Sequence, residues 1–146
     1  MRQLLINILA VTCGACFGIA VGAAILGIAS VAVTSPAMPD VASPGRLLAF
    51  VTAPDAMPYP AILLAHASGT LSGAALAAWL AASHALLAAM AVGFVFMTAG
   101  IATALSLPAP DWFDIIHLNL VFVPMAWLGW RLGRRLKRAP RAGHTR

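Results

Sequence analysis

Charged side chains are scarce in this sequence: they make up 9% of its 146 residues, whereas 62% are hydrophobic. A soluble domain of this length usually has about 25% charged residues. So few charges cannot cover a water-exposed surface, and most of the outer surface must therefore face lipid. The sequence thus excludes an ordinary soluble domain and predicts a single integral membrane domain.

Acidic residues and cysteines are also few, with four Asp or Glu and two Cys. Two cysteines cannot build a disulfide framework. Seven of the nine basic residues lie in the last sixteen positions, directly after an apolar run. This distribution argues against nucleic-acid binding and indicates a cytoplasmic anchor that contacts anionic lipid headgroups. The predicted membrane-surface residues are Arg134, Arg135, Lys137 and Arg138.

Long uncharged tracts determine the number of predicted membrane spans. The first tract, at about 4–33, exceeds the roughly 7–15 apolar residues of a secretory signal and predicts a retained helix. The second contains no charge over the 55 residues from 56 to 110. As one helix it would be about 80 Å long, whereas the hydrocarbon core is about 30 Å thick. It is therefore predicted to form two helices, at about 59–82 and 86–107, that turn near Ser83 and His84.

The last span is predicted at about 112–132, with a kink at Pro124, which cannot donate a backbone hydrogen bond. All four acids lie in the segment 34–58 and in the turn before the last span, with a single arginine. The positive-inside rule places the basic tail in the cytoplasm, and an even number of spans returns Arg2 to the same side.

The predicted fold class is an all-α integral membrane bundle of four transmembrane helices with cytoplasmic termini. It comprises a transmembrane domain at 1–133, with an outer loop at 34–58, and a basic cytoplasmic tail at 134–146.

Small residues recur at intervals of four in the predicted spans. Membrane helices associate by close backbone approach over such residues, because lipid tails are as apolar as leucine. The favoured interpretation is packing within the bundle, and the alternative is a homo-oligomer seam on the first helix. The predicted packing glycines are Gly14, Gly18, Gly22, Gly69, Gly73, Gly129 and Gly133.

Three ionisable residues are predicted to share the outer half of the bundle: His66, His117 and Asp114. Ionisable groups inside membrane spans are candidates for function, here a metal site or a proton-linked site. The simpler interpretation is that a neutral histidine makes one interhelical hydrogen bond and Asp114 caps the last helix. Two histidines alone also leave haem ligation open. No cofactor is predicted.

Cys13 and Cys16 have CxxC spacing, but apolar surroundings make a thiol inert. They are predicted to be small apolar filler, with a redox or metal role as the alternative.

Asn7 and Asn119 are candidates for hydrogen bonds between helices. Neither a nucleotide-binding fingerprint nor a catalytic triad occurs in the sequence, and the protein is predicted not to be an enzyme.

Four motifs resemble a family of small bacterial inner-membrane proteins with four predicted spans. They are LLAHASGTLSGAALAAWLA at 63–81, Gly100-Ile101, PAPDWF at 108–113 and PMAWLGWRL at 124–132. Members of that family have no assigned activity, so the resemblance implies a fold and no mechanism. The family tends to have an acidic residue where this chain has His117, and this chain adds Asp114 upstream. A role carried by that position does not transfer.

The leading functional prediction is an accessory, assembly or envelope protein of the bacterial inner membrane that acts through helix–helix contacts. Its predicted partners are the lipid bilayer and either further copies of itself or a larger membrane complex. The alternative is an oligomeric ion or metal transporter or channel with a His/Asp site near the periplasmic side. A membrane redox relay that uses the cysteines or the histidines is the third hypothesis.

Overall fold

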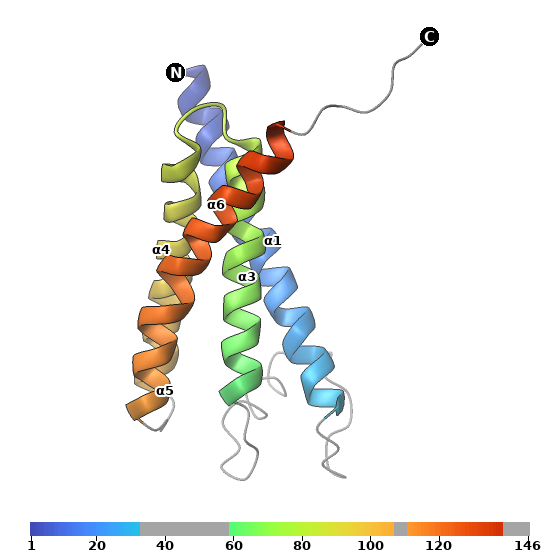
Figure 1. The fold of residues 1–146 in the computed structure, drawn as a ribbon, viewed down its shortest axis with the longest axis vertical. Coiled ribbons are helices and arrows are strands. Elements are labelled where there is room, and N and C mark those ends of the chain that lie inside the picture. Colours follow the sequence, from blue (N-terminus) through green and yellow to red (C-terminus); the bar gives the residue numbers. More distant parts are fainter. Residues whose placement is uncertain (33–58, 107–110, 139–146) are drawn as a thin grey trace.

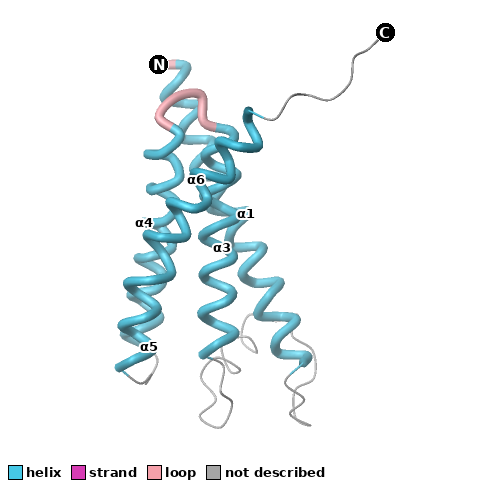
Figure 2. The backbone as a smooth tube through the Cα atoms, in the orientation of Figure 1, coloured by secondary structure: helices cyan, strands magenta, loops and turns pink. Residues whose placement is uncertain are grey.

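The computed structural model describes residues 1–32, 59–106 and 111–138. This part of the chain is all-helical, and four of its helices are long and apolar enough to cross a membrane, which confirms that part of the predicted fold class. Figure 2 shows how little of the described chain lies outside helices. The elements are α1 (Arg2–Ala32), α3 (Tyr59–Leu80), α4 (Ala85–Ser106), α5 (Asp111–Ile116), η1 (His117–Val121) and α6 (Phe122–Arg138).

The fourth span is longer and less regular than predicted. It consists of α5, a π-helical turn η1, and α6 in direct succession. It continues to Arg138, six residues beyond the predicted end at 132, with basic residues in its last turn. Arg and Lys are good helix formers, and cations at a helix C-terminus interact favourably with the helix dipole. The predicted loop at 34–58, the Pro-Ala-Pro turn and residues 139–146 lie outside the described residues.

Helix α3 is the central element, since it packs against α1, α4 and α6. In Figure 1, α1 and α6 are inclined to α3 in opposite senses. The N-terminus, the last turn of α6 and the turn between α3 and α4 lie at the same end of the molecule. That turn occupies residues 81–84, where the sequence predicted it. The hairpin of α3 and α4 therefore has its tip beside the N-terminus of α1.

Glycines let α1 approach the backbone of α3. A Cβ atom built on Gly14 would lie 2.5 Å from the carbonyl oxygen of Gly73, and one built on Gly69 would lie 2.7 Å from the carbonyl oxygen of Gly18. Farther along, Gly22 faces the carbonyl of Ala65. The glycine face of α1 is thus occupied by α3 within one chain, and a homo-oligomer through the same face would have to displace α3.

The opposite side of α3 receives α6 through a second glycine seam. A Cβ atom on Gly129 would lie 2.6 Å from the carbonyl oxygen of Leu71, and Gly133 meets the carbonyl of Ala75. Four alanines of α3 are fully buried between the two seams: Ala65, Ala74, Ala77 and Ala78.

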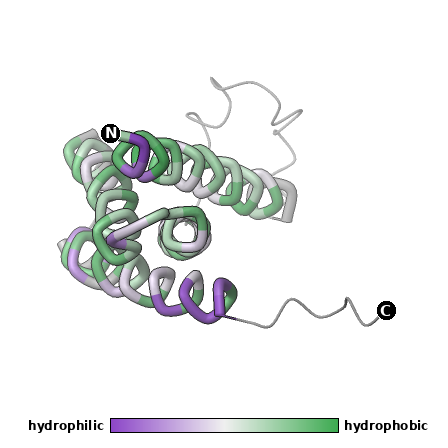
Figure 3. The backbone as a smooth tube through the Cα atoms, turned by 90° about the horizontal axis from the view of Figure 1, so that it is seen from above, coloured by the Kyte–Doolittle hydropathy of each residue, from purple (hydrophilic) through white to green (hydrophobic). Residues whose placement is uncertain are grey.

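Figure 3 shows a largely hydrophobic tube with hydrophilic residues gathered in the last turns of α6. Large apolar side chains such as Leu5 and Phe17 point outward and are 60% and 48% exposed.

Candidate functional site

The two histidines predicted to share the outer half of the bundle lie in direct contact. The Nδ1 atom of His66 and the Nε2 atom of His117 are 2.6 Å apart and share a hydrogen bond. Their rings are stacked, with centroids 4.8 Å apart and planes 8° from parallel. This contact joins the first half of α3 to the fourth span, in the half of the bundle away from the turn between α3 and α4.

Aromatic rings enclose the second histidine of this pair. The ring of His117 is fully buried. Its centroid lies 5.0 Å from that of Phe113 and 5.2 Å from that of Phe122, and both phenylalanines are also fully buried. His66 is half-buried, and its ring centroid is 6.0 Å from that of Phe122. The pair therefore has an inner member, His117, and an outer member, His66.

The backbone departs from α-helical geometry at His117, the first residue of the π-helical turn His117–Val121. Single π-turns inside α-helices are frequent at functional sites. The predicted kink was placed at Pro124, which lacks the N–H that would bond the carbonyl of Leu120. The irregular segment is upstream of this proline and includes Leu120 itself, because the helix is released from its regular hydrogen-bond pattern where the proline supplies no donor.

Asp114 does not complete the predicted metal site. Among the described residues, no three His, Cys, Asp or Glu side chains are grouped so that they could hold a metal ion. The Oδ1 atom of Asp114 and the Nδ1 atom of His117 are both buried, and neither has a hydrogen-bond partner among the described residues. The structure therefore brings His66 and His117 together and leaves two unsatisfied polar atoms one helical turn apart. Burying such atoms costs free energy, so each is a candidate to bind a water molecule or a ligand.

A cavity of about 220 Å³ adjoins the outer histidine. It lies between α1, α3 and α4, and among the described residues that line it His66 is the one with a polar side chain. Its lining residues are Ile19, Gly22, Ala23, Leu26, Ala65, His66, Val95, Phe96 and Ala99.

Cys13 and Cys16 are free cysteines with exposed side chains. They lie on α1, whose glycine face is turned toward α3, and so project away from that contact. The redox hypothesis for this pair stays a prediction.

Asn7 makes the interhelical hydrogen bonds at the opposite end of the bundle. Its Nδ2 atom donates to the Oγ atom of Ser83 over 3.0 Å, and its Oδ1 atom accepts from the backbone N–H groups of Ala82 and Ser83 over 3.1 and 3.3 Å. One amide thus holds the turn between α3 and α4 against α1. By contrast, Asn119 donates to the carbonyl of Ile115 within its own span and does not bridge helices.

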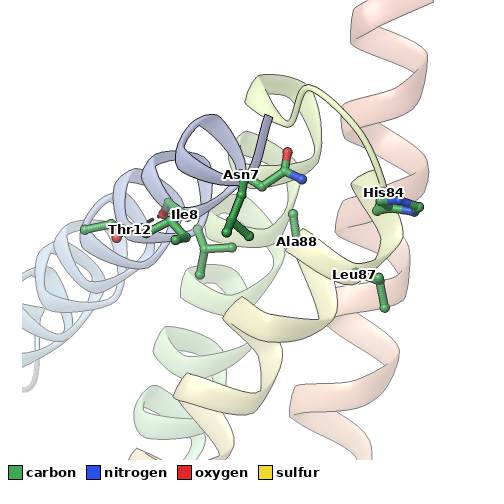
Figure 4. A pocket seen from close by; sticks show the side chains of 8 residues that line it. Asn7, Ile8, Thr12, His84, Leu87 and Ala88 are labelled. Atoms are coloured by element: carbon green, nitrogen blue, oxygen red, sulfur yellow. Dashed lines mark hydrogen bonds between the residues drawn. The ribbon is translucent and has the colours of Figure 1, made fainter. Parts of the chain in front are cut away.

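A groove of about 410 Å³ opens beside this amide, between α1 and the start of α4 (Figure 4). His84, the last residue of the turn, is in the lining and has a φ angle of 51°. Such a left-handed conformation is uncommon for residues other than glycine. It lets the chain reverse within four residues.

The basic end of α6 makes contacts that the sequence did not predict. The Nζ atom of Lys137 donates to the carbonyl oxygen of Ala81 over 2.5 Å, at the C-terminal end of α3. Arg131 lies over the ring of Trp127 at 4.2 Å, and Arg134 over Trp130 at 5.1 Å. The four-residue spacing of each Arg–Trp pair was a usable signal for these contacts. The partner of Lys137 was not predictable, because Ala81 is far away in sequence.

The chain matches no protein-family model, and no curated protein or solved structure matches it. The resemblance to small four-span inner-membrane proteins therefore stays a prediction that rests on the motifs in the sequence.

Proposed function

We propose that this chain is a multi-pass protein of the bacterial cytoplasmic membrane with both termini in the cytoplasm. Support comes from the gathering of the N-terminus and the basic end of α6 at one end of a bundle of four apolar helices. Basic segments remain on the cytoplasmic side, where anionic lipid headgroups attract them. The exposed side chains of Arg135 and Arg138 are suited to that contact.

We further propose that the protein acts as a non-enzymatic accessory or assembly component through helix–helix contacts within the membrane. The observation that carries this proposal is the closed centre of the bundle. Helix α3 is surrounded by the other spans, and most of its buried side chains are alanines. Such packing favours a rigid bundle that presents its outer faces over a conducting pore in one copy.

Cysteine labelling tests the orientation. Cys13 and Cys16 are replaced by alanine, and a single cysteine is introduced by Ala82→Cys in the exposed turn between α3 and α4. We expect a membrane-impermeant maleimide to label it only after the inner membrane is permeabilised. A matched cysteine, Ser43→Cys in the segment 34–58, is expected to be labelled from the periplasm. The reverse pattern would contradict the proposed orientation.

Native mass spectrometry from a mild detergent tests the accessory role. We expect a complex whose mass includes a different protein in a fixed stoichiometry. A mass equal to one chain, or to a whole multiple of it, would contradict an accessory subunit. A whole multiple would favour the alternative function.

That alternative is an oligomeric ion or metal transporter, which the direct contact of His66 with His117 favours. If it is correct, His66→Ala should abolish ion flux into proteoliposomes, whereas His84→Ala should not, since His84 lies exposed at the other end. Equal flux in the two variants, or no flux with the parent protein, would count against transport through this site.

A further inference from the structure

The cavity beside His66 has the shape and chemistry of a binding site for a small ring. Its walls come from three helices and are apolar except for His66. An apolar cavity of roughly 150 Å³ in a protein core can bind benzene. The volume of about 220 Å³ is therefore enough for one substituted six-membered ring. It is too small for a fused multi-ring lipid.

The rim of the cavity faces the outside of the bundle. Ile19 on α1 and Val95 on α4 line it and are 59% and 43% exposed. Ala23 also lines the cavity and is exposed. If the helices span a membrane, this rim opens toward lipid. A ligand could then enter from the bilayer and leave an apolar tail among the acyl chains.

The histidine pair can present either a donor or an acceptor to such a ligand. The Nδ1 atom of His66 is bonded to His117, so Nε2 is the ring nitrogen left for a ligand. In a neutral pair where Nε2–H of His117 donates to His66, the Nε2 atom of His66 carries a proton and can donate to a carbonyl. In the other tautomer the Nδ1–H group of His66 donates to the Nε2 atom of His117. The Nε2 atom of His66 then has no proton and can accept a hydrogen bond from a hydroxyl.

We propose that this cavity binds the ring of a membrane-soluble para-quinone, with an oxygen of the ring hydrogen-bonded to His66. A quinone has carbonyl oxygens and its reduced form has hydroxyls, and the two tautomers of the pair match these two forms. The other end of this chain of ring nitrogens is the buried Nδ1 atom of His117, which has no hydrogen-bond partner in the described part of the chain. The inference requires the described fold and not the accessory role proposed above.

The experiment compares two probes with the same carbon skeleton. Tetramethyl-1,4-benzoquinone has the ring oxygens, whereas tetramethylbenzene lacks them. The four methyl groups also block addition of the exposed thiols of Cys13 and Cys16 to the ring. Binding is measured as probe retained by nanodiscs that contain the protein over probe retained by empty nanodiscs. Because one hydrogen bond distinguishes the probes, we expect the quinone to bind about 5- to 10-fold more tightly.

Two exposed alanines of α1 provide matched variants. Ala23 lines the cavity and Ala20 does not, so Ala23→Phe should fill the site while Ala20→Phe places the same ring outside it. We expect Ala23→Phe to lose retention of the quinone and Ala20→Phe to keep it. Circular dichroism checks that both variants are folded.

His66→Phe removes the ring nitrogens and should make the two probes bind equally. The carbonyl stretch of the bound quinone, shifted to lower frequency in the parent protein, should return to its value in lipid. Equal retention of the two probes by the parent protein would overturn the proposal. Unchanged quinone retention in folded Ala23→Phe would also overturn it, whether or not His66→Phe folds.

Discussion

The contact between α1 and α3 can be tested by adding a single methyl group. In Gly14→Ala, the new Cβ atom would lie 2.5 Å from the carbonyl oxygen of Gly73 and 2.8 Å from the Cβ atom of Ala77. The van der Waals attraction between two non-bonded atoms is strongest at a separation of about 3.5 Å. The two helices must therefore move apart locally by about 1 Å. The obstructing atoms belong to backbone or to an alanine, neither of which can rotate away. The backbones of α1 and α3 must therefore move apart.

The expected loss of stability is obtained by comparing Gly14→Ala with Gly27→Ala on the same helix. A Cβ atom on Gly27 would meet nothing within 4 Å. Both variants gain the same helix propensity of about 1 kcal/mol, which cancels in the comparison. Overpacking a well-packed contact costs about 1–3 kcal/mol. We therefore expect the free energy of unfolding of Gly14→Ala to be lower than that of Gly27→Ala by about that amount.

The assay is reversible unfolding in mixed micelles of a mild detergent and dodecyl sulfate, followed by far-ultraviolet circular dichroism. Each variant is measured over the same range of dodecyl sulfate mole fraction. The transitions are fitted with one common slope for the dependence of the free energy of unfolding on mole fraction, and their midpoints are compared. Equal free energies of unfolding for Gly14→Ala and Gly27→Ala would refute the reasoning. The close approach of α1 to α3 would then not be a feature of the folded protein.

Substitutions of Asn7 and His84 test the end of the bundle that holds the N-terminus. Asn7→Ala removes three hydrogen bonds to the turn at 82–83 and should lower the free energy of unfolding by about 1–2 kcal/mol. Asn119→Ala, which loses a bond within its own span, should change it by less than about 0.5 kcal/mol; equal effects would contradict the bridging role of Asn7. His84 has a φ angle of 51°, so His84→Val should be less stable than His84→Gly by about 1–2 kcal/mol in the same assay. Equal stabilities would argue against a left-handed turn.

The sequence alone was enough to locate the helices and the turn between α3 and α4. Hydropathy is a local property, and the length of an uncharged tract limits how many times it can cross a membrane. The helical extension of the last span to Arg138 was missed because its charges were taken as the end of the apolar span, although they also favour the helix C-terminus.

Tertiary structure alone decided which surfaces meet. The glycine face of α1 packs on α3 rather than remaining free, and α3 carries α6 on its other side. His66 and His117 share a hydrogen bond, while Asp114 stays outside the pair, with a buried oxygen that no described residue bonds. The spacing of residues along a helix defines the faces of that helix but does not say which helix each face contacts. The contacts depend on the crossing geometry of the helices and on pairs of residues that are distant in sequence, such as Asn7 with Ser83 and Lys137 with Ala81.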